Sequence, residues 1–356
     1  MPEAPSATAP ASPPPLDYPG PRSRGPRAAA RWTALLWPAL ALIALLAYNF
    51  VFTPGFFDVG YRDGRLVGSL IDVLDRAAPV AVVAFGMTLV IATGGIDLSV
   101  GAVVAIAGSV AAVLLQGGAP VAVAIAVALA ACAACGAVNG LLVAAAGVQP
   151  IVATLILMVA GRGVAQMVGQ NVPIRSDAFN FLGNGARFAM PFSVTLAAAV
   201  LIALAVLARA TALGLFVESV GNNPTAARYA GVAARPVVFA VYVVSGLCAG
   251  IAGLVLAGDI GRADANKAGL FLELDAILAV VVGGTALVGG RFSLVGSALG
   301  ALLMQALTTT ILTTKLAGRG IPPDAALVVK AAVVLGVCLL QSPDFRARLT
   351  RRRAAA

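Results

Sequence analysis

The chain has 356 residues, of which 60% are hydrophobic and 11% are charged, and its net charge is +9. A soluble domain usually carries about 25% charged residues, so the composition excludes an ordinary soluble enzyme and indicates an integral membrane protein. The continuous apolar runs favour helices over the short alternating segments of a membrane β-barrel. Much of the positive charge lies near the two ends, which argues against nucleic-acid binding and places both termini in the cytoplasm.

Ten apolar segments follow an N-terminal tail, 1–30, that is rich in Pro, Ala and Ser and is predicted to be disordered. The even number agrees with two cytoplasmic ends. Residues 66–76 are predicted to lie along the membrane interface before the second span. A membrane domain, 31–343, is then followed by a basic cytoplasmic tail, 344–356. The predicted spans are 32–53, 77–93, 99–116, 120–146, 150–171, 190–208, 237–258, 274–290, 294–314 and 324–342.

Two glycine-rich breaks interrupt the apolar sequence, TGGIDLSVG at 93–101 and a similar stretch from Gly283 to Gly296. Paired glycines permit a sharp turn, so the sequence predicts an all-α membrane protein with broken helices. Asp97 is the one charged residue between Arg76 and Arg162, and a lone acid facing lipid is costly. It either lines a transport path or, the favoured alternative, joins Ser99 in capping the next helix and holding the turn.

The polar loop 211–235 is the most informative segment outside the spans. Asn223 is placed to cap a short helix that Pro224 begins and Gly231 ends. A short helix exposed in the cytoplasm could bind a subunit that drives transport. The alternative from composition alone is a solvated loop without a special role.

Several other polar residues have two possible roles. Asn139 and Gln166 are candidates for the transport path, or each holds a neighbouring helix by a hydrogen bond. Glu273 and Asp275 could contact a delivery protein, although capping of the eighth span is favoured. Lys330 is expected to snorkel or to form an ion pair. The CxxC pair at 132–135 lies in an Ala-rich run and is assigned to helix packing, and no metal site is predicted.

Three motifs resemble the permease subunits of bacterial ribose-type sugar importers of the ATP-binding-cassette (ABC) class. They are TGGIDLSVG at 93–101, GNNPTAARYAGV at 221–232 and ELDAILAVVVGGTALVGG at 273–290, and the similarity runs from about Leu66 to Ser342. Within the family, stretches at 149–166 and 259–277 are most similar to the galactofuranose branch. The resemblance implies a pore of two permeases, identical or paralogous, two cytoplasmic ATPase subunits and an extracytoplasmic sugar-binding protein.

The resemblance also implies roles for individual residues. This chain has no GxxxxGK[ST] phosphate loop, so it is not expected to be an enzyme, and ATP and Mg²⁺ belong to the partner ATPase. Glu273 and Asp275 are the candidates for contact with the binding protein, beside their favoured role in capping. The predicted ATPase-coupling residues are Glu218, Gly221, Asn222, Ala227, Arg228 and Gly231. The predicted path and hinge residues are Thr93, Gly94, Gly95, Asp97, Ser99, Asn139, Gln166, Gly283, Gly284 and Thr285.

The function expected from these observations is import of a monosaccharide across the bacterial inner membrane by alternating access. A sugar is neutral, so its path needs only modest polarity from hydroxyl, amide and backbone groups. The alternatives are a secondary transporter driven by an ion gradient, suggested by Asp97 and the repeated break, and a membrane scaffold that transports nothing.

Overall fold

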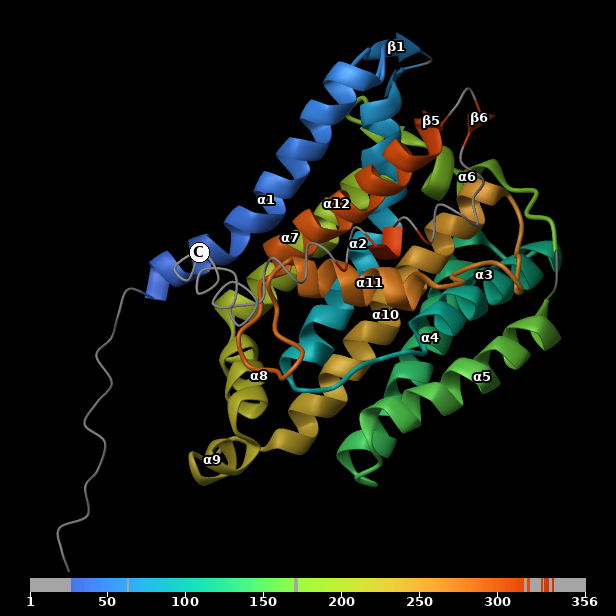
Figure 1. Cartoon of the computed structure of the whole chain (residues 1–356). Helices are drawn as coiled ribbons and strands as arrows, with labels where there is room; N and C mark the ends of the chain where they lie inside the picture. The colour runs from blue at the N-terminus through green and yellow to red at the C-terminus, as the bar shows by residue number, and fades with distance from the viewer. Residues whose placement is uncertain are drawn as a thin grey trace, which may run out of the picture.

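A computed structural model describes residues 27–62, 64–169, 172–316 and 319–320, with a few positions between 328 and 335. The described chain is a bundle of helices with short two-stranded hairpins at one end (Figure 1). Antiparallel pairs join β1 (Gly60–Arg62) to β2 (Arg65–Val67), β3 (Ala186–Arg187) to β4 (Met190–Pro191), and β5 (Lys315–Leu316) to β6 (Arg319–Gly320). The helices are α1 (Arg27–Phe52), α2 (Ser69–Ala92), α3 (Val100–Gln116), α4 (Val121–Ala144), α5 (Pro150–Val168), α6 (Asp177–Asn184), α7 (Phe192–Ala210), α8 (Leu213–Asn222), α9 (Pro224–Tyr229), α10 (Ala234–Ile260), α11 (Leu272–Val282) and α12 (Leu294–Thr313).

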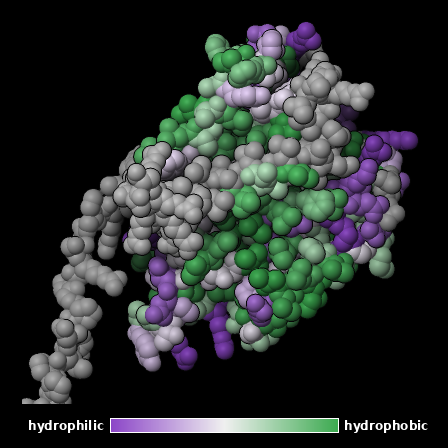
Figure 2. Space-filling model, in the orientation of Figure 1, coloured by the Kyte–Doolittle hydropathy of each residue, from purple (hydrophilic) through white to green (hydrophobic). Residues whose placement is uncertain are grey.

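Seven of the described helices are long and apolar enough to cross a membrane: α1, α2, α4, α5, α7, α10 and α12. Helix α3 is apolar but shorter, at 17 residues. Figure 2 shows apolar residues across the middle of one face, with hydrophilic residues gathered toward its upper and lower ends. This distribution is the one that a bilayer requires of a multi-pass protein.

The centre of the bundle is formed by α2, which is buried along nearly its whole length from Ala77 onward, and by α10, which packs against α2, α3 and α4. Glycine lies at the closest approaches. A methyl group on Gly86 of α2 would lie 2.8 Å from the Cα of Ser245 on α10, so the two backbones nearly touch. Without a hydrophobic drive between helices in lipid, close van der Waals contact of this kind holds membrane helices together.

Two predicted segments differ from the structure. The interfacial helix predicted at 66–76 does not exist separately, because α2 runs unbroken from Ser69 and carries Asp72, Asp75 and Arg76 in its first two turns. Asp75 accepts a hydrogen bond from the hydroxyl of Ser193 on α7, so this charge is partnered within the bundle.

The eighth predicted span, 274–290, is also wrong as a continuous helix. Helix α11 ends at Val282 after 11 residues, and residues 283–293 continue without helix to the lower end of the bundle, near α8 (Figure 1). At about 1.5 Å per residue, α11 covers roughly half of a bilayer, so this segment is a half-helix with an extended continuation.

The predictions for the two ends of the chain can be compared with the structure only in part. Helix α1 begins at Arg27, so the last four residues of the predicted disordered tail are helical. The rest of that tail, most of the tenth predicted span, 324–342, and the basic tail, 344–356, lie outside the described residues.

Candidate functional site

The first glycine break begins where α2 ends. The N–H of Thr93 bonds to the carbonyl of Leu89, that of Gly94 to Ile91 and that of Gly95 to Val90. Gly94 has a φ of +81°, a conformation that glycine adopts without strain. This is the Schellman arrangement, which satisfies the last carbonyls of a helix and turns the chain sharply away.

The second break repeats this turn residue by residue. The N–H of Gly283 bonds to Ala279, that of Gly284 to Val281 and that of Thr285 to Val280, and Gly284 has a φ of +91°. The acid of the first break has no counterpart in the turn itself. The repeated element is therefore a helix stop built on a left-handed glycine, as the similar sequences predicted.

The two breaks and the loop 211–235 meet at one point, which we call the glycine junction and define as Ala92, Gly94, Gly221, Gly289 and Gly290. The N–H of Gly290 donates to the carbonyl of Ala92 at 2.8 Å. A methyl group on Gly221 would overlap that carbonyl oxygen and lie 2.5 Å from the nitrogen of Gly290. A methyl group on Gly289 would lie 2.9 Å from the nitrogen of Gly94. Three segments far apart in sequence thus touch through their backbones.

Helix α8 ends at this junction, and α9 follows it at the lower end of the bundle (Figure 1). Asn223 accepts a hydrogen bond from the N–H of Ala226 at 3.0 Å, Pro224 is the first residue of α9, and Gly231 follows the helix with a φ of +83°. The predicted short helix and its cap are therefore confirmed. Of the α9 residues only Ala227 is buried, whereas Arg228 and Tyr229 are exposed, Tyr229 to 89%. Helix α9 therefore presents an exposed surface, and it is joined to the breaks through the end of α8.

Asp97 lies in the extended stretch between α2 and α3 and is 1% exposed. Its Oδ1 accepts from the N–H of Ser99 at 3.0 Å and from the hydroxyl of Ser99 at 2.6 Å. Its Oδ2 accepts from the hydroxyl of Ser245 on α10 at 2.9 Å, and Asn139 of α4 donates to the oxygen of Ser99 at 2.8 Å. We call these four residues the Asp97 network.

The Asp97 network confirms one half of the predicted cap and corrects the other. Ser99, the residue before α3, makes no cap with its own side chain, whereas Asp97 accepts from the N–H of Ser99, whose backbone is already helical. The network also ties the break to α4 and α10. Sequence reasoning missed Ser245, whose only signal is a hydroxyl beside a glycine in an otherwise apolar helix.

The remaining predicted residues lie in separate places. Gln166 donates to the side chain of Asn266 at 2.8 Å, in the loop before α11, and is not brought to the Asp97 network. Glu273 lies in the first turn of α11, where a methyl group on Gly101 of α3 would collide with its carboxylate. Glu273 and Asp275 both lie in the first turn of α11, where a negative charge favours the helix, and the N-cap residue Phe271 makes no side-chain cap of its own, so their capping role stays a prediction.

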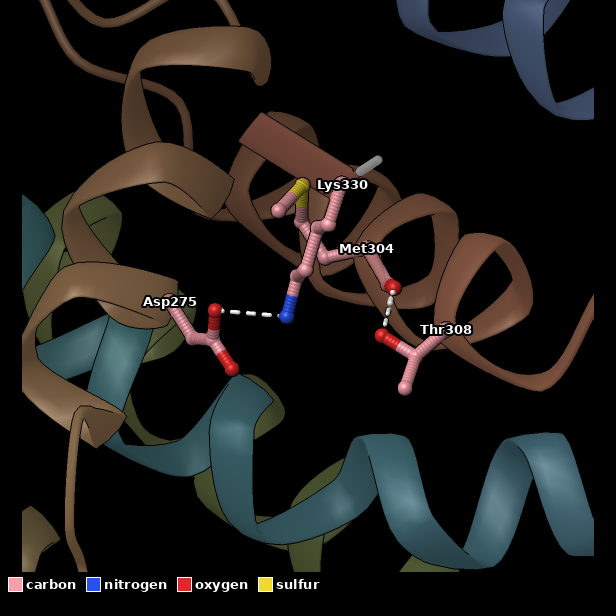
Figure 3. A network of polar contacts seen from close by, with 4 residues as sticks. All are labelled: Asp275, Met304, Thr308 and Lys330. Carbon is pink, nitrogen blue, oxygen red and sulfur yellow. Dashed lines mark hydrogen bonds and ion pairs between the residues drawn. The ribbon is translucent and has the colours of Figure 1, made fainter. Parts of the chain in front are cut away.

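Asp275 forms an ion pair inside the chain. Its Oδ1 lies 2.6 Å from Nζ of Lys330, and the lysine side chain is only 11% exposed (Figure 3). The pairing predicted as one alternative for Lys330 is confirmed. It connects the start of the half-helix α11 to the segment that follows α12 over 55 residues of sequence.

A multi-pass membrane protein with two broken helices, both in backbone contact with the end of α8 beside the exposed helix α9, is the class that these observations define. Residues 69–338 match the family described as the permease component of the branched-chain amino acid transport system, and the chain belongs to this family. No solved structure matches the chain.

The chain is similar over most of its length to curated sugar permeases. It is 52% identical to the galactofuranose transporter permease protein YtfT of Escherichia coli K12, covering 86% of this chain and 89% of that protein. It is 40% identical to the fructose import permease protein FruF of Bifidobacterium longum, covering 88% and 90%. It is 35% identical to the ribose import permease protein RbsC of E. coli K12, covering 85% and 92%.

Proposed function

We propose that this chain is the membrane-spanning permease subunit of an ABC importer for a monosaccharide, with galactofuranose or a close relative as the substrate. The single structural observation that carries the proposal is the glycine junction, which brings the end of α8, directly before the exposed helix α9, into backbone contact with both breaks. The sugar permeases similar to this chain support the substrate class.

The partners follow from this assignment. Two cytoplasmic ATPase subunits bind ATP and Mg²⁺ and hydrolyse the nucleotide, so the permease itself is not an enzyme. A second permease, identical or paralogous, completes the pore, and an extracytoplasmic binding protein delivers the sugar. The chain lies in the bacterial inner membrane in contact with lipid, with both termini in the cytoplasm. We also propose that Glu273 and Asp275 contact the binding protein. Asp275 in addition forms the ion pair with Lys330.

The mechanism that fits this geometry is alternating access. Closure of the ATPases displaces α9, and α8 carries that displacement to Gly221 and Asn222. Because Gly221 lies against the carbonyl of Ala92 and beside Gly290, the end of α2 and the extended segment after α11 must move with it. Packed backbones without side chains between them transmit a displacement as discrete shifts and do not absorb it by rotamer changes. The coupling segment therefore acts on both breaks by direct contact.

The second candidate is a secondary transporter that uses Asp97 to bind an ion or a proton. Both carboxylate oxygens of Asp97 already accept hydrogen bonds from Ser99 and Ser245. Because its oxygens are engaged in this way, Asp97 is better suited to holding the break than to binding a transported ion. This favours ATP over an ion gradient as the driving force.

Uptake by proteoliposomes containing the complete complex tests the proposal. Radiolabelled galactofuranose, fructose, ribose and leucine are offered separately, with ATP inside or absent, and with or without an ionophore. We expect uptake of one of the sugars that requires ATP and survives the ionophore. Uptake of leucine in place of the sugars would contradict the substrate class, and uptake without ATP that the ionophore abolishes would establish the secondary transporter.

A further inference from the structure

Two polar atoms beside the first break are buried without a hydrogen-bond partner among the described residues: Oη of Tyr242 on α10 and Oδ1 of Asn139 on α4. Both side chains are 0% exposed, and Tyr242 is among the largest fully buried side chains. A third such atom, Oδ1 of Asn180, belongs to α6. Native proteins contain few unpaired buried polar groups, because each carries a desolvation cost, so a pair beside one segment requires an explanation.

The orientation of the Asn139 amide follows from the hydrogen bonds around it. The single proton of the Ser99 hydroxyl is donated to Asp97, so the Ser99 oxygen can only accept from Asn139. The NH₂ group of Asn139 must therefore face Ser99. The carbonyl oxygen is left as an acceptor, and rotating the amide would break the existing bond.

The Tyr242 hydroxyl lies over the same break. A methyl group on Gly95 would lie 2.7 Å from Oη of Tyr242, so this ring is accommodated only because residue 95 has no side chain. Ser245, which holds Asp97, is three residues further along α10 and therefore on the same helix face. An unused donor and an unused acceptor thus flank residues 95–99 from two different helices.

We propose that Tyr242 and Asn139 form a binding site for the hydroxyl groups of a sugar in the translocation path. The site is closed in the described conformation and opens when the segment 93–99 moves away from α10. This inference rests on the proposed function and adds to it the groups that touch the substrate. The phenol donates to one sugar oxygen and the Asn139 carbonyl accepts from a sugar hydroxyl. A neutral ligand suits the site, because both groups are uncharged and the nearest acid, Asp97, is already occupied.

Replacing the phenol alone gives a test that separates this role from a structural one. Since Oη has no partner in the described conformation, Tyr242→Phe removes no hydrogen bond, and insertion and melting temperature should stay at least equal to the wild type. Loss of one neutral hydrogen bond to the moving sugar should lower the maximal uptake rate about two- to tenfold. ATP hydrolysis stimulated by the loaded binding protein should be retained. Tyr48→Phe, on the partly exposed helix α1, is the matched control and should transport normally.

Hydroxyl-radical footprinting of the same complex reports the opening without depending on a substrate. Tyr242 should be protected without nucleotide and should become oxidised in the vanadate-trapped state, whereas Tyr61, which is 67% exposed at the end of the bundle away from α9, should be labelled in at least one state. If the wild type and Tyr242→Phe take up sugar at the same rate, the inference is overturned. This holds even if Tyr242 becomes oxidised in the trapped state, because the side chain then contacts water and not the sugar. Protection of Tyr242 in both states would also overturn it. Absence of wild-type uptake would refute the proposed function instead.

Discussion

Replacing Gly221 by alanine should disrupt the glycine junction. The added methyl group would overlap the carbonyl oxygen of Ala92 and approach the nitrogen of Gly290 to 2.5 Å, where these two groups share a hydrogen bond. Both obstacles are backbone atoms, so no rotamer change relieves them. Overpacking costs about 1–3 kcal/mol, and loss of the hydrogen bond adds about 0.5–1.5 kcal/mol. The better helix propensity of alanine returns about 1 kcal/mol, so we expect a net loss of about 0.5–3.5 kcal/mol.

The assay compares thermal unfolding of the purified complex with ATP-driven uptake per folded permease. Gly163→Ala is the matched control, because Gly163 also lies within a helix and a methyl group there would meet nothing within 4 Å. We expect Gly163→Ala to transport as the wild type and to melt at the same temperature or slightly later, because alanine favours the helix. Gly221→Ala should melt earlier and lose uptake beyond the loss of folded protein. If the two variants are indistinguishable in both measurements, the close contact at the junction is not real and the reasoning fails.

Three further predictions concern the charged groups. Asp275→Asn should leave the nearly buried Lys330 unpaired and lower the free energy of unfolding by about 1–3 kcal/mol. This cost is smaller than for a fully buried pair, because Asp275 is 31% exposed. The double variant Asp275→Lys with Lys330→Asp should recover part of the melting temperature. Asp97→Asn should keep most of the uptake, because the amide oxygen can accept both bonds from Ser99 and the amide NH₂ can donate to Ser245, whose hydroxyl then accepts. Asp97→Ala should cost at least about 2 kcal/mol by leaving buried donors unpaired, and equal loss in both variants would return the charge itself to the mechanism. Arg228→Glu should insert normally but fail to co-purify with the ATPase, and retained ATPase binding would remove α9 from the coupling surface.

The features that local chemistry determines could be predicted from the sequence. Asn223, Pro224 and Gly231 gave the short helix α9, because an N-cap, a first-turn proline and a left-handed glycine act within a few residues. Most long helices were also found within a few residues of their observed ends, because continuous apolar sequence indicates a span. The breaks were visible as paired glycines.

The errors arose where a local pattern allowed two structures. Charges near Asp72 suggested an interfacial helix, but a helix can continue through charges at its polar end. The apolar residues on both sides of Gly283 suggested one span, but the left-handed turn at Gly284 ends α11. The partners in contacts between distant segments could not be predicted, even where a pairing was expected, as for Lys330. Ser245 joins Asp97 over 148 residues of sequence, and no motif marks Tyr242.

A pair of spin-label distances measured in the complete complex tests the central claim that α9 and the breaks move together. Labels at Tyr229 and Val288, both 89% exposed, report α9 against the second break, and labels at Val288 and Tyr61 report that break against the opposite end of the bundle. On trapping with ATP and vanadate, the distance between 229 and 288 should stay constant while the distance between 288 and 61 changes. A change between 229 and 288 while 288 and 61 stay fixed would show that α9 moves without the breaks and would contradict the account.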